Sequence, residues 1–362
     1  MFLEFLFGIL FGIIAGLIPS VHINFIAAIV PSNSPYFLIP LAIIFSYLNT
    51  IPAILLQYAD DYTITLKTQA SEWLKQGRAM EAIDLTILGS FYASIISINV
   101  VFLLDFVPLD AIKYFSVAVL ATIIIYFLKI DFLISLLYGF LGFFSFNFKQ
   151  GLFHIFSLGI ATYNFFHFSK SKIPEQKIIY GKIKLKELIA LIFVSLLSII
   201  FLFYPGITSS LAIVPLMYLF RNQKNERLYF LFIGALNSAS YVFAPFLLKF
   251  NIARNFLVQR LKFTSTLEFY LVTIIAVIVS FILARKIMLY SIKFISKLNL
   301  PFFNTIIFIF TLILSFYYDN IFGILIGFCS YFLIYLLNFK NKPRYLILAS
   351  IAIPVFMKKV LK

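Results

Sequence analysis

The chain has 362 residues, of which 62% are hydrophobic and 12% charged, and its mean hydropathy is +1.03. A water-soluble domain does not carry so many apolar residues, so we expect an all-α integral membrane protein whose main partner is the lipid bilayer. The 29 basic and 14 acidic residues give a net charge of +15, but the basic residues are distributed over membrane loops, which argues against nucleic acid as a partner.

Apolar stretches of about 20 residues, the length that crosses a bilayer, recur along the whole chain. A basic connector, residues 169–186, lies between two sets of them, and the excess of Lys in this connector places it in the cytoplasm. The sequence therefore predicts a multi-pass cell-membrane protein with an N-terminal half, 1–168, and a C-terminal half, 187–362. The predicted spans lie near 36–56, 82–104, 111–128, 132–147 and 151–168, and near 228–247, 266–284, 299–317, 321–338 and 345–357.

Each half opens with an apolar segment that is broken by a proline. The first, "GLIPSVHINFIAAIVP" (16–31), aligns with the second, "FYPGITSSLAIVP" (203–215), proline on proline, and "SYLNTIP" aligns with "GALNSAS" further on. With the five spans predicted above for each half, each half is then a re-entrant-like broken hairpin plus about five spans. Because five is odd and a hairpin returns to its own side, the halves must have opposite orientations. This is the inverted repeat of many secondary transporters.

The two breaks suggest an anion site. A proline inside a span removes a backbone donor and frees a carbonyl, and hydrocarbon satisfies neither group, so a break has to face protein or water. Half-helices that begin there point positive dipole ends inward, and we expect neutral donors near the midplane with no buried carboxylate facing them. The alternative is that each proline only kinks a packing helix. The predicted substrate-binding residues are Pro19, Ser20, His22, Asn24, Asn49, Pro205, Gly206, Thr208, Ser209, Ser210 and Asn237.

The arm at 57–80 carries more charge than a turn between two spans requires. One interpretation is a gate, in which basic residues meet the anion and carboxylates help to hold a coupling cation, H⁺ or Na⁺. The other interpretation is an amphipathic interfacial segment with solvated charges, anchored by Trp73. The predicted gating residues are Asp60, Asp61, Lys67 and Arg78, with Arg254 as the basic counterpart in the second half.

These segments also carry a family resemblance. The first break resembles the Gly-Leu-Leu-Pro-Gly stretch of the large permease subunit of the tripartite tricarboxylate transporters, the TctA type, and most of all its shorter archaeal branch. The second break and "IARNFLVQ" look like later motifs of that family, although Ser20 and Asn255-Phe256 depart from its glycine and its Ser-Gly. The matches in the arm are Ile51-Pro52, Asp60-Asp61, Lys75-Gly77-Arg78-Ala79 and Glu81-Ala82.

The resemblance implies a permease that moves a small organic anion such as a carboxylate by alternating access, with a small membrane subunit as its partner. A second hypothesis is a translocase of polyprenyl phosphates, because a phosphate headgroup suits the same helix N-termini. A soluble carboxylate needs a closed site with several donors, whereas a lipid needs a cleft that is open to the bilayer.

Other polar residues give weaker signals. His154 and His167 share one predicted span without further ligands at metal-binding spacing, so we interpret both as packing or interfacial residues. Asp84 lies near the start of a span and is interpreted as a helix cap rather than a proton relay. Because the chain has no P-loop, nucleophile elbow or zinc motif, we predict no cofactor, no metal site and no enzymatic activity.

Overall fold

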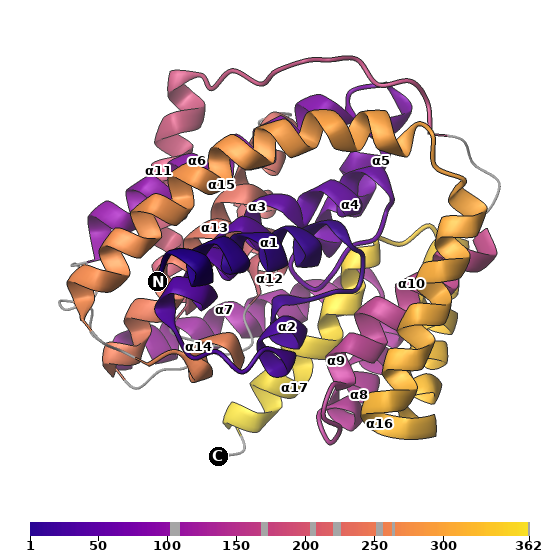
Figure 1. The fold of residues 1–362 in the computed structure, drawn as a ribbon. Coiled ribbons are helices and arrows are strands. Elements are labelled where there is room, and N and C mark those ends of the chain that lie inside the picture. Colours follow the sequence, from indigo (N-terminus) through magenta and orange to yellow (C-terminus); the bar gives the residue numbers. More distant parts are fainter. Residues whose placement is uncertain are drawn as a thin grey trace.

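The computed structural model describes residues 1–101, 109–167, 173–202, 208–219, 226–250, 256–262 and 265–360. Over these residues the chain consists of packed helices and contains no strand, as the sequence predicts (Figure 1). The α-helices are α1 (Phe2–Leu17), α2 (Ile23–Ile29), α3 (Pro35–Leu48), α4 (Thr50–Leu55), α5 (Lys67–Lys75), α6 (Ala79–Val100), α7 (Leu109–Ile130), α8 (Phe132–Ser145), α9 (Gly151–Phe153), α10 (Gly159–His167), α11 (Leu185–Leu202), α12 (Ser209–Leu219), α13 (Glu226–Phe243), α14 (Phe256–Arg260), α15 (Thr266–Ile295), α16 (Leu300–Phe339) and α17 (Ala349–Val360). The remaining helical segments are η1 (Ile64–Leu66), η5 (Ala244–Phe250) and η6 (Arg344–Leu348), which are 3-10 helices, and η3 (His154–Leu158), which is a π-helix.

Several of these helices are suited to a bilayer. In the described part of the chain, five stretches are long and apolar enough to cross a membrane, and α1, α8 and the later part of α7 are shorter apolar helices. Together they confirm an all-α membrane protein. The five stretches are 35–55, 79–100, 226–250, 266–295 and 300–339.

The long helix α16 is two antiparallel limbs. Asp319 (φ −138°, ψ 23°) and Asn320 (φ 52°, ψ −142°) leave helical geometry in its middle. A Cβ on Gly323 would lie 2.5 Å from the carbonyl oxygen of Ser315, so residues on opposite sides of the kink meet and the chain reverses. The division of this stretch into two predicted spans is therefore confirmed.

Helix α15 continues beyond the end predicted for its span. Arg285 lies within it and donates from Nε and Nη2 to the two carboxylate oxygens of Asp84 on α6, at 2.8 and 2.9 Å. The prediction ended the span before this arginine and placed Arg285 on the cytoplasmic side, and the helix continues with its charge paired. Asp84 is fully buried in this pair, and the N-cap residue of α6 is Arg78, so the capping role predicted for Asp84 was wrong.

Glycines set the distance between α1 and α3. Gly8, Gly12 and Gly16 follow one another at a spacing of four, which places them on one face of α1. A Cβ on Gly12 would lie 2.7 Å from the carbonyl oxygen of Leu41, and one on Gly16 would lie 2.7 Å from Cβ of Leu48. Side chains larger than hydrogen would force the helices apart, which is the packing typical of small residues in membrane helices.

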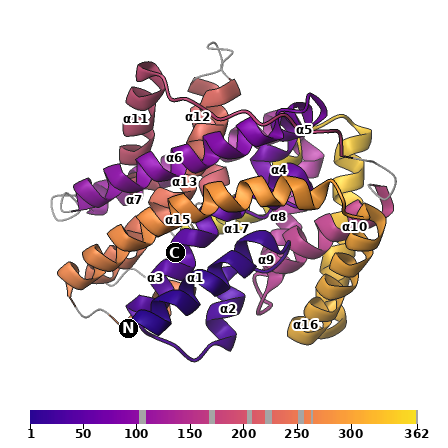
Figure 2. The same ribbon diagram turned by 45° about the horizontal axis from the view of Figure 1, so that its top comes forward.

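The helices form two groups, which Figure 2 shows from a second direction. In one group α3 packs against α15 and α13, α6 packs against α13 and α15, and α1 covers α3. In the other group α10 packs on α16 and the last helix, α17, packs on α8. The break between α1 and α2 and the turn after α4 face the loop between α8 and α9, and a cavity lies between them.

Candidate functional site

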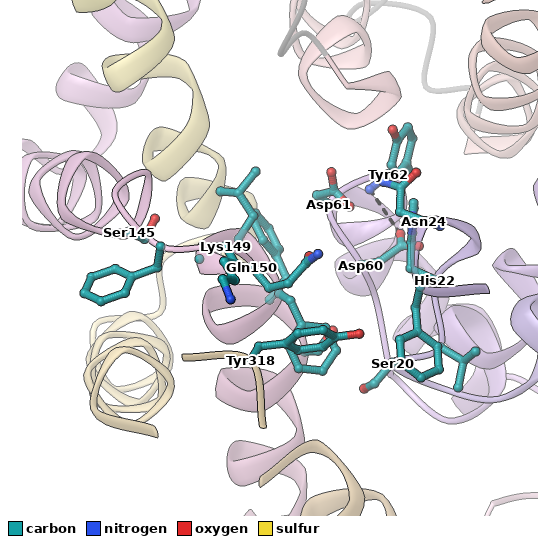
Figure 3. A pocket seen from close by; sticks show the side chains of 18 of the residues that line it. Ser20, His22, Asn24, Asp60, Asp61, Tyr62, Ser145, Lys149, Gln150 and Tyr318 are labelled. Atoms are coloured by element: carbon teal, nitrogen blue, oxygen red, sulfur yellow. Dashed lines mark hydrogen bonds between the residues drawn. The ribbon is translucent and has the colours of Figure 1, made fainter. Parts of the chain in front are cut away.

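The main cavity has a volume of about 290 Å³ (Figure 3). One wall comes from the first break and from the turn after α4, and the other comes from the α8–α9 loop and the tip of α16. A smaller cavity of about 30 Å³ adjoins it, shares Ser20 and Asp60 with it, and is also lined by Pro19 and Asn49. The polar side chains of the main cavity are Ser20, His22, Asn24, Asp60, Asp61, Tyr62, Ser145, Lys149, Gln150, Ser157 and Tyr318.

The first break reverses the chain between α1 and α2. Ser20 has a φ of 70°, in the left-handed region that glycine adopts freely and other residues adopt at a cost. The family that the break resembles has a glycine at this position, so the backbone explains that glycine. In this chain the serine places a hydroxyl at both cavities.

His22 begins α2 and has an unused donor beside the cavity. Its Nδ1 accepts a hydrogen bond from the backbone N–H of Asn24 at 3.1 Å, so the neutral imidazole carries its proton on Nε2. Among the described residues, neither His22 Nε2 nor Asn24 Oδ1 has a hydrogen-bond partner, although both atoms are buried. The ring is stacked on Tyr62 and meets the edge of Phe45. A bound ligand would satisfy this donor and this acceptor.

Asp60 shapes the turn after α4. Its Oδ1 accepts hydrogen bonds from the backbone N–H groups of Tyr62 and Thr63 at 3.0 and 2.9 Å, and from the Thr63 hydroxyl at 2.7 Å. Its Oδ2 lies 3.5 Å from Nδ2 of Asn49. We expected no buried carboxylate to face the site, but the start of the arm folds inward behind the break and brings two half-buried carboxylates, Asp60 and Asp61, to the cavity.

Sequence reasoning missed the opposite wall. The backbone N–H groups of Lys149 and Gln150 donate to the carboxylate of Asp319 at 3.1 and 3.0 Å, so the α8–α9 loop is held on the tip of α16. Of the described residues that line the main cavity, Lys149 is the one lysine or arginine. The available signal was a lone Lys and a lone Asp, each between two predicted spans.

The two asparagines that the repeat aligns do meet. Asn237 on α13 donates from Nδ2 to Oδ1 of Asn49 at 2.9 Å and to the carbonyl oxygen of Ser46 at 3.0 Å. Ser46 and Ser238 share a further hydrogen bond of 2.9 Å between the same two helices. Asn49 lines the small cavity, and Asn237 reaches it only through Asn49.

The second break is not joined to the first in the described residues. Thr208, Ser209 and Ser210 start α12 and are buried, and the Thr208 hydroxyl accepts from the backbone N–H of Leu211 at 3.4 Å. These three described side chains line neither of the two cavities. Pro205, Gly206, Arg254 and the Lys67 side chain lie outside the described residues.

The later part of the arm packs against the protein rather than at a membrane surface. Trp73 is 1% exposed, so its predicted role as an interfacial anchor was wrong. Arg78 lies 3.8 Å over the Trp73 ring and forms an ion pair of 2.9 Å with Glu81, which also binds Arg227 at 2.8 Å. The charge of Arg78 is therefore committed to this network, and Arg78 lines neither cavity.

The two histidines of one predicted span differ. His154 is fully buried, and its two ring nitrogens form hydrogen bonds with Asp319 and Ser315, partners that the sequence did not reveal. His167 stacks on Tyr163 and bonds to its carbonyl oxygen at 3.1 Å, as a packing residue does. Among the described residues, no three His, Cys, Asp or Glu side chains are grouped so that they could hold a metal ion.

Comparison with known proteins gives one match. Residues 1–171 match the family described as the tripartite tricarboxylate transporter TctA family. No curated protein and no solved structure matches the chain. The matched segment contains the first break, the arm and the α8–α9 loop, and so most of the polar wall of the main cavity. Over residues 1–171, slightly less than half of its length, the chain is thus similar to the TctA family of membrane transport proteins.

Proposed function

We propose that the protein is a secondary transporter that binds a small carboxylate anion in the main cavity and moves it by alternating access. The observation that carries the proposal is the polar lining of this cavity, which includes Lys149 and His22, and the Nε2–H donor of His22 is buried without a partner among the described residues. Ser20 and Gln150 add a hydroxyl and an amide. Carboxylates bind best to charged donors.

A coupling cation, H⁺ or Na⁺, is part of the proposal. Asp60 and Asp61 line the same cavity as Lys149, and two carboxylates would repel an anion unless a cation or a proton accompanied it. Asp60 is the candidate for this role, because its Oδ1 is occupied by the turn while its Oδ2 has only a long contact to Asn49. Cation and anion would then move together.

The inverted repeat supplies the means of alternating access. We propose halves at 1–168 and 187–362, joined by the connector at 169–186 and related by opposite orientation. The contacts between helices support this arrangement. The contact of α3 with α15 corresponds to that of α13 with α6, and the contact of α1 with α3 corresponds to that of α11 with α13. Rocking of such halves about a central site is the usual motion of transporters built in this way.

The setting of the protein follows from the same proposal. We place it in the cell membrane, because the described spans and the family match point to a multi-pass transporter. The family description names a three-part system, and we propose a small membrane subunit as a partner.

The test is a binding measurement with two variants. Purified protein is titrated with citrate and with succinate by calorimetry, as wild type, as Lys149→Gln and as Lys129→Gln. Lys129 is an exposed lysine at the end of α7, away from the cavity lining, and serves as the control. Loss of a hydrogen bond to a charged group corresponds to a Kd about 10- to 100-fold weaker in Lys149→Gln. Equal Kd values in both variants would contradict the proposal, and binding of an isoprenyl phosphate in place of both carboxylates would favour the lipid translocase.

A further inference from the structure

An ionisable pair, His154 and Asp319, lies directly behind the wall of the main cavity that the α8–α9 loop forms. His154 Nε2 and Asp319 Oδ2 are 2.7 Å apart, and His154 Nδ1 is 3.0 Å from the hydroxyl oxygen of Ser315. The three residues come from the π-helix η3 and from the limb and tip of α16. Their sequence neighbours Phe153 and Tyr318 line the main cavity. The pair is therefore one residue removed from the cavity lining on both elements.

The hydrogen bonds of this pair suit both protonation states of the imidazole. Asp319 is an acceptor, so Nε2 of His154 carries a proton in either state. In the neutral ring, Nδ1 accepts from the Ser315 hydroxyl. In the charged ring, Nδ1 donates to the same oxygen, because a hydroxyl can act as donor or acceptor. Both ring nitrogens of His154 therefore keep a hydrogen-bond partner when a proton is gained or lost.

The charge of the pair changes what the cavity can hold. With a neutral imidazole the pair carries the full negative charge of Asp319, whereas with a protonated imidazole it is neutral. Asp319 also accepts the backbone N–H groups of Lys149 and Gln150, so its charge lies directly behind the anion-binding wall. A negative charge repels a nearby anion strongly in a poorly hydrated site.

We propose that His154 and Asp319 form a proton-binding site whose protonation is linked to the binding of an anion in the main cavity. The inference rests on the proposed function and names one site for its coupling ion. The proton comes from solvent and binds Nδ1 of His154, which then donates to Ser315, while Nε2–H stays on Asp319. Linkage is reciprocal, so the anion favours the proton as much as the proton favours the anion.

Local structure agrees with a functional role. A π-helix begins at His154, and such irregular turns are frequent at functional sites. The elements that pack on η3 are α9, α10 and α16. In their described residues they carry tyrosines, one cysteine, His167 and a single carboxylate, Asp319, while Lys149 lies in the loop before α9. Intramembrane ionisable pairs of this kind are functional candidates in transporters.

The experiment counts protons. Purified full-length protein in nanodiscs is titrated with citrate by calorimetry at one pH in two buffers of different ionisation enthalpy, which gives the number of protons taken up per bound anion. Each titration of citrate into buffer alone is subtracted. Variants are His154→Gln and, as a matched histidine outside the cavity, His167→Gln. The wild type should take up at most about one proton per bound anion, and His167→Gln should take up the same number.

His154→Gln should bind citrate without proton uptake and with lower affinity. If His154→Gln does not fold, Ser315→Ala takes its place, because Nδ1 of His154 then has no hydroxyl oxygen to accept the added proton and proton uptake per anion should fall. Citrate binding without proton uptake, or uptake unchanged in His154→Gln, would overturn this inference and leave the proposed function standing. Failure of the wild type to bind citrate or succinate would overturn both.

Discussion

At the scale of single residues, Ser20 has the most demanding backbone position of the first break. Its φ of 70° is in a region that a residue with a Cβ adopts at a cost of about 1–2 kcal/mol. The Ser20→Gly substitution removes this cost but adds chain entropy to the unfolded state. We therefore expect a gain in unfolding free energy of up to about 1 kcal/mol.

Ser20→Ala is the matched control for this prediction, since alanine keeps the backbone cost and lacks the hydroxyl. Thermal unfolding should rank Ser20→Gly above Ser20→Ala, while both variants weaken citrate binding because the hydroxyl at the two cavities is gone. A less stable Ser20→Gly would show that the backbone at the break is held differently.

Residue-level reasoning led to residues on one wall of the main cavity and missed those on the other wall. The proline motif led to Ser20, His22 and Asn24, because a broken span has to satisfy its polar groups locally and so marks itself in the sequence. Lys149 and Asp319 carry no such local mark. They are 170 positions apart in the chain and become a unit only when the α8–α9 loop docks on the tip of α16.

At the scale of elements, α1 is placed by its glycine face against α3. The Gly12→Val substitution would push the helices apart, because even the Cβ of the new side chain would lie 2.7 Å from the carbonyl oxygen of Leu41. Overpacking of this kind costs about 1–3 kcal/mol, so we expect a lower unfolding temperature. Citrate affinity should fall as well, because α1 carries the break into the cavity.

The control for this prediction is Leu10→Val on the outer face of α1, where Leu10 is 49% exposed. It should leave both stability and affinity close to those of the wild type. If Gly12→Val behaved like Leu10→Val in unfolding experiments, close contact between α1 and α3 would not be needed for the fold.

Helices could be predicted from the apolar runs, but their ends depended on tertiary partners. The two limbs of α16 were predicted because a short polar interruption separates two apolar runs. Helix α15 extends past the predicted span, and Arg285 in this extension is paired with a carboxylate of another helix. The inward fold of the turn at Asp60 was also missed. Charged residues between two spans are typical of a solvated loop, and the hydrogen-bond partners of Asp60 are backbone groups of the turn itself.

At the scale of the whole molecule, charged pairs join the two proposed halves at the end away from the main cavity lining. Asp84 of α6 is fully buried and holds Arg285 of α15, and it also accepts the backbone N–H of Gly181 in the connector at 2.7 Å. Asp84→Asn leaves the arginine without its charged partner. Because the Arg285 side chain is 34% exposed and keeps contact with solvent, we expect a cost of about 1–3 kcal/mol and a lower unfolding temperature.

Glu4→Gln provides the comparison, because Glu4 is 46% exposed and pairs only with the N-terminal amine and the Ser34 hydroxyl among the described residues. Its unfolding free energy should stay within about 0.5 kcal/mol of the wild type. Similar unfolding temperatures for the two variants would mean that the pair between α6 and α15 does not hold the halves together.

Transport of a carboxylate through the main cavity is the central claim, and flux into proteoliposomes tests it most directly. Labelled citrate is offered outside vesicles that contain unlabelled citrate, and exchange is measured for the wild type, Lys149→Gln and Lys129→Gln. The account predicts exchange by the wild type and by Lys129→Gln, and a rate at subsaturating citrate about tenfold or more lower in Lys149→Gln. Exchange by Lys149→Gln equal to that of the wild type, or none by the wild type above empty vesicles, would contradict it.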